Sequence, residues 1–97
     1  MDIALLRRTL GLSQSEFGQL LGVHLMTVSK WERGIAHPSP YQDALLEEFR
    51  RAAAASAQGI GTKIKARLAG RGVAAALHFL LATAVKEEED GDAPGRR

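Results

Sequence analysis

The sequence predicts an all-α fold, and two observations lead to that class. Apolar residues recur at intervals of three and four along most of the chain, the spacing that lines one face of a helix. The alternation of polar and apolar residues that is typical of a strand is clear only over residues 62–68. We therefore expect a compact domain of four helices followed by two C-terminal helices.

The first three helices follow from apolar spacing, capping residues and glycines. One helix runs from Ile3 to Leu10, and Gly11 ends it. Ser13 and Glu16 predict a capping box, in which each side chain satisfies an unpaired backbone amide of the other residue at the start of the second helix. The second helix has an apolar face of Phe17, Leu20 and Leu21 and ends at Gly22. The third helix is expected over residues 25–33, with Val28 and Trp31 on its apolar face, and Gly34 ends it.

Three more helices complete the prediction. Ser39 and Pro40 favour a helix start, because proline at the first helical position gives up only an amide that is unpaired anyway. Residues 61–69 are expected to be helical, with a short strand over 62–68 as the alternative, and the last helix runs from 73 to about 88. The inner face of the fourth helix is expected to consist of Tyr41, Leu45 and Phe49, with Ala44 and Leu46 beside them.

Charge and alanine content divide the chain into three parts. Residues 1–57 carry six basic and six acidic side chains, whereas residues 58–86 carry five basic side chains and no acidic one. Alanines concentrate after residue 50, with 13 of the 16, and five acidic residues fall between 87 and 92. We expect a first helical region over 1–57, a dimerisation region over 58–86 and a disordered acidic tail over 87–97.

Length and composition exclude several classes of protein. The chain of 97 residues has room for one domain of ordinary size. It has no cysteine, and His24, His37 and His78 are far apart, so we expect no metal site and no cofactor. No serine has the flanking pattern of a nucleophile, and we expect no enzymatic activity. Without a signal peptide, or an apolar stretch long enough for a bilayer, the protein is expected to be soluble and cytoplasmic, associated with the nucleoid.

Residues 13–33 have the arrangement of a helix-turn-helix motif, two short helices separated by a few residues that include Gly22. Over about residues 3–50 the sequence resembles the phage-repressor, Cro-like (xenobiotic-response-element) family. The resemblance implies a lambda-repressor-like fold and a sequence-specific binder of double-stranded DNA that regulates transcription. It rests on Gly11 to Gln14, Phe17 and Gly18, Leu21 to Val23, Thr27 to Gly34, and Pro38 to Pro40.

The resemblance also implies which residues contact DNA, because the second helix of the motif lies in the major groove. His24 replaces the usual serine or threonine cap, and Leu25 and Met26 are apolar where polar residues are frequent. We expect Leu25 and Met26 to recognise thymine methyl groups, with a contribution to the core or to a lid as the alternative. The implied base-reading residues are His24, Leu25, Met26, Ser29 and Lys30, and the implied phosphate contacts are Gln14, Thr27 and Arg33.

An ion pair between the first and third helices is a further expectation. In the family, a glutamate at the position of Glu32 commonly pairs with a basic residue of the first helix, and Arg7 occupies the matching position. The alternative is that both charges lie unpaired on the surface. If the pair is buried, removing one partner leaves the other charge without compensation.

The last helix is apolar nearly all round, which predicts that it is buried on every side. A chain of this length cannot readily surround one helix and also build a four-helix core, so we expect a two-fold homodimer. The alternative is a monomer in which this helix packs only on Leu45, Phe49 and residues 52–55. The expected dimer contacts are Val73, Leu77, Leu80 and Leu81.

Several functions remain open at this stage. The favoured hypothesis is a dimeric repressor that binds an inverted-repeat operator. The first alternative is the antitoxin of a toxin–antitoxin pair, in which the last helix binds the toxin and DNA binding serves autoregulation. Other settings are the regulation of phage defence or counter-defence genes, and an adaptor that has lost DNA binding. The basic residues Lys63, Lys65, Arg67 and Arg71 either contact backbone phosphates or form a solvated face.

Overall fold

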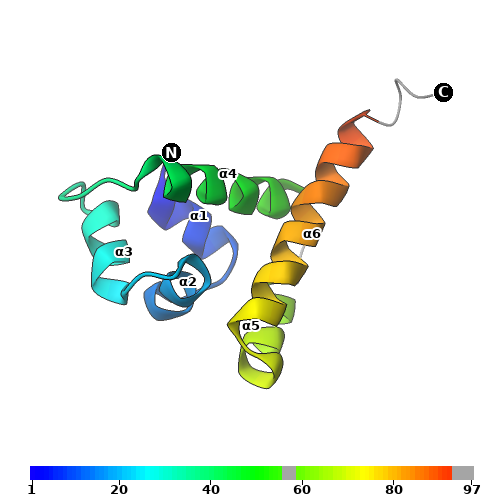
Figure 1. Ribbon diagram of the computed structural model, residues 1–97, viewed down its shortest axis with the longest axis horizontal. Coiled ribbons are helices and arrows are strands. Elements are labelled where there is room, and N and C mark those ends of the chain that lie inside the picture. Colours follow the sequence, from blue (N-terminus) through cyan, green and yellow to red (C-terminus); the bar gives the residue numbers. More distant parts are fainter. Residues whose placement is uncertain (56–58, 93–97) are drawn as a thin grey trace.

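The computed structural model describes residues 1–55 and 59–92, with side chains up to residue 85. The described residues form helices and connecting turns without any strand, so the predicted all-α class is confirmed (Figure 1). Residues 62–68, for which a short strand was the alternative prediction, are helical. The helices are α1 (Ile3–Thr9), α2 (Gln14–Leu21), α3 (Leu25–Glu32), α4 (Pro40–Ala55), α5 (Ile60–Arg71) and α6 (Val73–Asp92).

The helix ends are set by short side chains and glycines, largely as the sequence predicts. Both hydrogen bonds of the Ser13–Glu16 capping box are present, at 3.0 and 2.8 Å. A second box, which the sequence analysis missed, joins Ser39 and Gln42 at the start of α4, at 3.2 and 2.7 Å. It follows the same spacing of a hydroxyl residue and a glutamine three positions later. The predicted glycine stops Gly11, Gly22 and Gly34 all have positive φ, between 72° and 75°.

One hydrophobic core joins both halves of the described chain. At its centre the rings of Phe17 and Phe49 meet edge to face, with centroids 5.7 Å apart. Leu10, Val28 and Leu46 are buried around them. Because Ile64 and Leu80 belong to the same cluster, α5 and α6 complete the core of the N-terminal helices and do not form a separate one.

The prediction for the inner face of α4 is wrong at Tyr41, which is 76% exposed, and at Ala44, which is also exposed. The buried residues of this helix are Leu46, Phe49 and Ala52. Tyr41 lies about 140° around the helix from Leu46, on the opposite side. The spacing of Tyr41, Leu45 and Phe49 by four residues fits a helical stripe, but the stripe that faces the core starts from Leu46.

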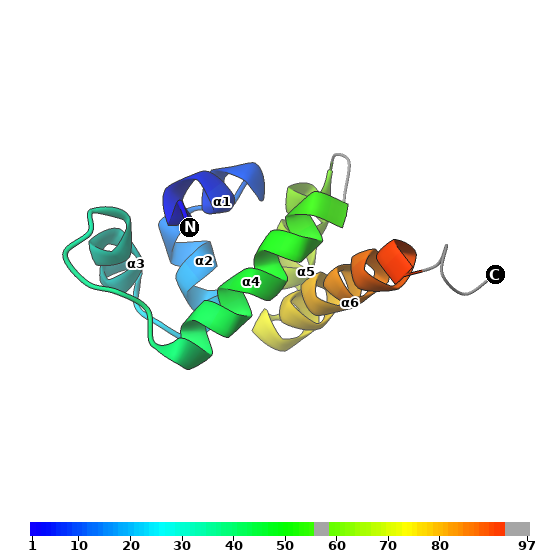
Figure 2. The same ribbon diagram turned by 90° about the horizontal axis from the view of Figure 1, so that it is seen from above.

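The C-terminal helices form a hairpin that packs on the rest of the protein. α6 lies along α4 and α5, with Ala76, Leu80 and Ala84 buried (Figures 1 and 2). Leu80 is fully buried in the core of one chain, so it has no exposed surface to offer a second copy and its predicted role as a dimer contact is wrong. The sequence showed that this helix is apolar all round but not which side α4 would cover.

The boundaries of the predicted regions differ in part from the structure. α6 continues to Asp92, so residues 87–92, expected within the disordered tail, extend the helix. The expected junction at 57–58 and the last five residues, 93–97, lie outside the described residues. Within the described part of the chain, no helix is long and apolar enough to cross a membrane.

Candidate nucleic-acid interface

The turn between α2 and α3 depends on two glycines. At Gly18, an added Cβ would lie 2.6 Å from the carbonyl oxygen of Val23, so only glycine allows the two helices to approach this closely. Val23 is also hydrogen-bonded to α2, because its backbone N–H donates to the Gly18 carbonyl at 2.9 Å. Gly22 has φ 73°, a left-handed conformation that disfavours other residues. These contacts fix the position of α3 relative to α2.

α3 has one face in the core and one face outside. Val28 and Trp31 are buried, as predicted. Leu25 and Met26 are 38% and 50% exposed, so the alternative in which they help to build the core is wrong. Lys30 is also exposed. The outward face of α3 therefore combines two apolar side chains with a cation.

His24 caps α3 through its ring. Its Nδ1 accepts a hydrogen bond from the backbone N–H of Met26 at 3.0 Å, which satisfies one amide at the start of the helix. An accepting Nδ1 places the imidazole proton on Nε2. His24 therefore caps α3 in place of the usual serine or threonine, and its Nε2–H is left to donate to another group.

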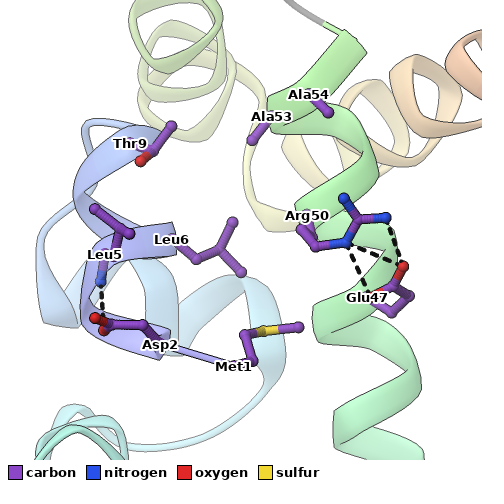
Figure 3. Close-up of a pocket in the computed structure, with 9 residues that line it drawn as sticks. All are labelled: Met1, Asp2, Leu5, Leu6, Thr9, Glu47, Arg50, Ala53 and Ala54. Carbon is purple, nitrogen blue, oxygen red and sulfur yellow. Dashed lines mark hydrogen bonds and ion pairs between the residues drawn. The ribbon is translucent and has the colours of Figure 1, made fainter.

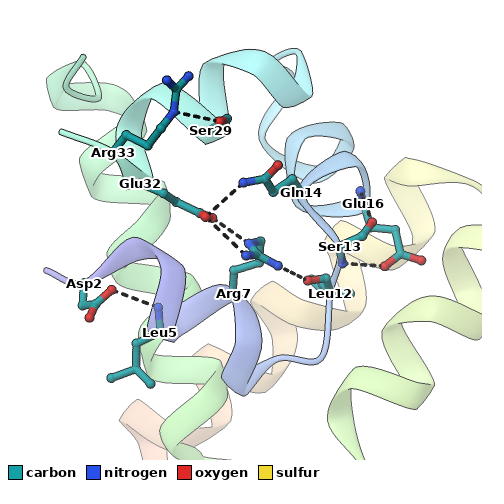
Figure 4. A network of polar contacts seen from close by, with 10 residues as sticks. All are labelled: Asp2, Leu5, Arg7, Leu12, Ser13, Gln14, Glu16, Ser29, Glu32 and Arg33. Atoms are coloured by element: carbon teal, nitrogen blue, oxygen red, sulfur yellow. Dashed lines mark hydrogen bonds and ion pairs between the residues drawn. The ribbon is translucent and has the colours of Figure 1, made fainter. Parts of the chain in front are cut away.

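Two of the predicted contact residues interact on the outward side of α3. The Nε–H of Arg33 donates to the Ser29 hydroxyl at 3.2 Å (Figure 4). The hydroxyl accepts this bond and keeps its own proton for another acceptor. Arg33 keeps the remaining N–H groups of its guanidinium, so the pair holds several donors on the surface of the helix.

Glu32 turns to the opposite side of α3 and joins three helices (Figure 4). Arg7 donates to its two carboxylate oxygens from Nε at 2.6 Å and from Nη2 at 3.2 Å. The Gln14 amide donates to Oε1 at 3.1 Å, and Arg7 also donates to the Leu12 carbonyl at 2.9 Å. The pair that the sequence suggested is thus present, with Arg7 and Glu32 only 15% and 10% exposed.

The surroundings of Glu32 favour its charged form. Burial acts to raise the pKa of this carboxyl, but the hydrogen bonds from Arg7 and Gln14 and the charges of Arg7 and Arg8 outweigh it. The pKa of Glu32 therefore lies below its ordinary value. The first turn of α2 is fixed against α1 and α3 by this charged pair.

Comparison with known proteins gives one match. The helix-turn-helix family model matches residues 3–41, from the start of α1 to the second residue of α4. Residues 3–41 are therefore similar to a helix-turn-helix domain, in agreement with the resemblance to the phage-repressor and Cro-like family. The family is one of DNA-binding regulators of transcription. Searches among curated proteins and among solved structures found no match to the chain.

In the helix-turn-helix domain, the predicted phosphate contact Gln14 is already engaged with Glu32. Its amide nitrogen carries two N–H groups, and a carboxylate can only accept. One N–H is used by Glu32, at 3.1 Å, and the other is left to donate elsewhere. Gln14 is therefore able to connect the Arg7–Glu32 pair to a phosphate in front of α2.

The domain also has a groove that the sequence analysis missed, of about 530 Å³, between α1 and α4 (Figure 3). Met1, Leu5 and Ala53 contribute apolar surface, and the ion pair of Glu47 and Arg50, at 2.7 Å, lies on the α4 side. Figure 4 shows Leu5 on the far side of the Arg7–Glu32 pair from Ser29, so the groove is separate from the outward face of α3. Local spacing could not reveal it, because α1 and α4 are distant in sequence.

Across residues whose side chains are described, no group of three or more histidine, aspartate or glutamate side chains could hold a metal ion.

Proposed function

We propose that this protein binds a specific double-stranded DNA sequence through the outward face of α3 and acts as a dimeric repressor at an inverted-repeat operator. The observation that carries the proposal is the composition of that face. Leu25 and Met26 are exposed although they are large and apolar, and they lie next to the donors of Ser29 and Lys30. An exposed apolar pair on a helix of this family is suited to thymine methyl groups, which only the major groove displays.

Each residue of the face has its own role in the proposal. Lys30 donates to a guanine or to another acceptor on a base edge, and Met26 and Leu25 contact thymine methyl groups. Ser29 and the outer N–H of His24 supply further hydrogen bonds. Gln14, Thr27 and Arg33 bind backbone phosphates, which fix the position of the helix but carry no sequence information.

The dimer is proposed to form through α6. Val73 and Val85 of this helix are exposed, and Leu77 and Leu81 are only partly buried. α3 and α6 lie at opposite ends of the molecule in both views (Figures 1 and 2). A two-fold axis beside α6 then places the two copies of α3 well apart, so the half-sites are separated by one turn of DNA, roughly 34 Å, or by a multiple of it.

The experiment starts from a duplex library with a randomised centre, from which the wild-type protein selects its preferred sequence. Binding of variants is then measured at one fixed salt concentration. Lys30→Ala is expected to relax the preference at one base pair per half-site by about 1–3 kcal/mol. Met26→Ala is expected to lose discrimination between thymine and uracil at one position, because uracil lacks the methyl group. Gln14→Ala is expected to weaken binding to all sequences alike.

Leu5→Ala is the matched control for Met26→Ala, because Leu5 is also an exposed apolar residue but lies on the groove side of the domain. It is expected to bind as the wild type does. If Lys30→Ala and Met26→Ala both keep wild-type affinity and sequence preference, α3 is not the reading helix. Failure of the library to yield any preferred sequence would contradict the proposal as a whole.

The antitoxin alternative uses the same residues of α6 for a different partner. The exposed Val73 and Val85 would then contact a toxin and not a second copy. The product of a neighbouring gene, co-expressed and purified with this chain, distinguishes the two: a stable complex that silences a toxic activity supports the antitoxin, and a homodimer alone supports the repressor.

A further inference from the structure

α5 is held in a fixed position against the helix-turn-helix domain. A Cβ added at Gly61 would collide with the carbonyl oxygen of Leu10, so the backbones of α5 and of the α1–α2 connection are in direct contact. Ile64 is fully buried and Ile60 nearly so. Because the contact is backbone to backbone and the apolar side of α5 is in the core, the position of α5 relative to the α1–α2 connection is fixed.

The basic side chains of α5 are divided between two sides of the helix. Lys65 faces α2, where its Nζ lies 3.8 Å from Oε1 of Glu16. Arg67 faces α6, with the guanidinium carbon 4.0 Å from the centroid of the Phe79 ring. Lys63 is four residues before Arg67 and shares its side. The sequence treated these cations as one set, whereas an ion pair to the helix-turn-helix motif is described for Lys65.

Lys65 is loosely held by its partner. Its side chain is 48% exposed and that of Glu16 is 30% exposed, and an exposed pair at this separation contributes little. Glu16 is also engaged with the Ser13 amide, at 2.8 Å, in the capping box. The Lys65 ammonium is therefore able to exchange Glu16 for another anion that approaches the first turn of α2, where Gln14 lies.

The distribution of charge along the chain is the reason to expect that Lys65 exchanges Glu16 for a phosphate of DNA. Residues 1–57 carry equal numbers of basic and acidic side chains, six each, so the helix-turn-helix region has no net charge to offer DNA. Affinity for DNA depends mainly on neutralising phosphates. α5 carries Lys63, Lys65, Arg67 and Arg71 without an acidic residue.

We infer that Lys65 contacts a backbone phosphate next to the one bound at Gln14, so that α5 extends the DNA contact beyond the helix-turn-helix motif. The inference rests on the proposed function. Figure 4 shows Glu16 on the side of α2 away from the Arg7–Glu32 pair, which places the contact on the flank of the site and not over the bases. The role of Lys65 is therefore affinity and register without sequence preference.

The test is the salt dependence of binding, measured on two duplexes: the sequence selected by the wild-type protein and an unselected sequence of the same length. Lys65→Ala is expected to lower the slope of log affinity against log salt by about 0.9 per protomer, on both duplexes. Between 50 and 200 mM salt this amounts to about a 3.5-fold smaller loss of affinity per contact. Lys65→Glu is expected to bind more weakly than Lys65→Ala, and Lys65→Arg to restore the wild-type slope.

Lys63→Ala is the matched control, because it removes the same charge from the same helix on the side that faces α6. It is expected to keep the wild-type slope. A Lys65→Ala slope equal to that of Lys63→Ala overturns the inference while leaving the proposed function intact. Absence of any sequence preference in the wild-type protein is a different result, which overturns both. Melting curves of each variant show whether the protein stays folded. A Lys65→Ala protein that melts as the wild type does, but has a reduced slope of log affinity against log salt, supports the inference.

Discussion

At the scale of single residues, the Arg7–Glu32 pair links the stability of the protein to its DNA-binding surface. Its carboxylate accepts hydrogen bonds from Arg7 on α1 and Gln14 on α2, while Glu32 itself belongs to α3. α1 and the two helices of the motif, α2 and α3, therefore meet at one charged group. Gln14 is both a partner of this group and the expected phosphate contact, so loss of the pair should also disturb the first turn of α2.

The first prediction concerns the loss of either partner. Arg7→Ala and Glu32→Gln should both lower the free energy of unfolding, by about 3–5 kcal/mol for a pair shielded from solvent. Chemical denaturation at neutral pH measures the loss. Gln14→Ala removes one neutral donor and should cost less, about 1 kcal/mol.

The pH dependence provides a control for this prediction. Because the pKa of Glu32 lies below its ordinary value of 4.5, its contribution to stability is complete above that pH and is lost as the pH falls through the lower folded-state pKa. The difference in stability between wild type and Glu32→Gln should therefore be constant near neutrality and shrink in acid. Equal stability of the two proteins at pH 7 would show that the ion pair contributes nothing.

At the scale of elements, the position of α5 depends on the absence of a side chain at one residue. Gly61 lies against the Leu10 carbonyl, whereas Gly70, in the last turn of the same helix, has nothing within 4 Å of the position of a Cβ. Both glycines weaken the helix to a similar degree by their flexibility. Only Gly61 is required by packing.

The second prediction compares these two glycines. Gly70→Ala should stabilise the protein, by up to about 1 kcal/mol, because alanine favours a helix. Gly61→Ala should destabilise it, by about 1–3 kcal/mol or more, because the backbones of α5 and the α1–α2 connection must separate. Thermal unfolding measures both. A Gly61→Ala protein that melts at or above the wild-type temperature would contradict the close contact.

At the scale of the whole molecule, α6 has two different sides. Ala76, Leu80 and Ala84 are buried within the chain, whereas Val85 is 49% exposed and Leu81 is partly buried. The buried side completes the core, and the other side is the one through which we propose that a second copy binds. Burial of the first side accompanies folding, and burial of the second side would require association.

The third prediction separates folding from association. Wild-type protein should scatter light as a particle of twice the 10.4 kDa chain mass at micromolar concentration. Val85→Glu should give the mass of one chain with unchanged helix content, because it places a charge on the exposed side. Leu80→Ala should lower folding stability by about 2–5 kcal/mol, because it leaves a cavity in the core. A wild-type mass of one chain would rule out the homodimer.

The sequence by itself determined the helices and the motif, because caps, glycine stops and apolar spacing act within a few residues. The Ser13–Glu16 box, the turn at Gly22 and the buried pair Val28 and Trp31 all lie where these local rules place them. The resemblance to a known family led to the pairing of Arg7 with Glu32, which spacing alone does not show.

Only the tertiary structure decided which apolar residues are covered and by what. Tyr41 and Leu80 both fit helical stripes, yet one is exposed and the other fully buried. The choice depends on where α4 and α6 cross, and that depends on packing between residues far apart in the chain. In the same way, the packing of α5 beside α2 brought Lys65 next to Glu16 of the motif. Helical spacing shows which side chains share one face of a helix. Which face is buried depends on a second helix, and the local sequence does not specify where that helix packs.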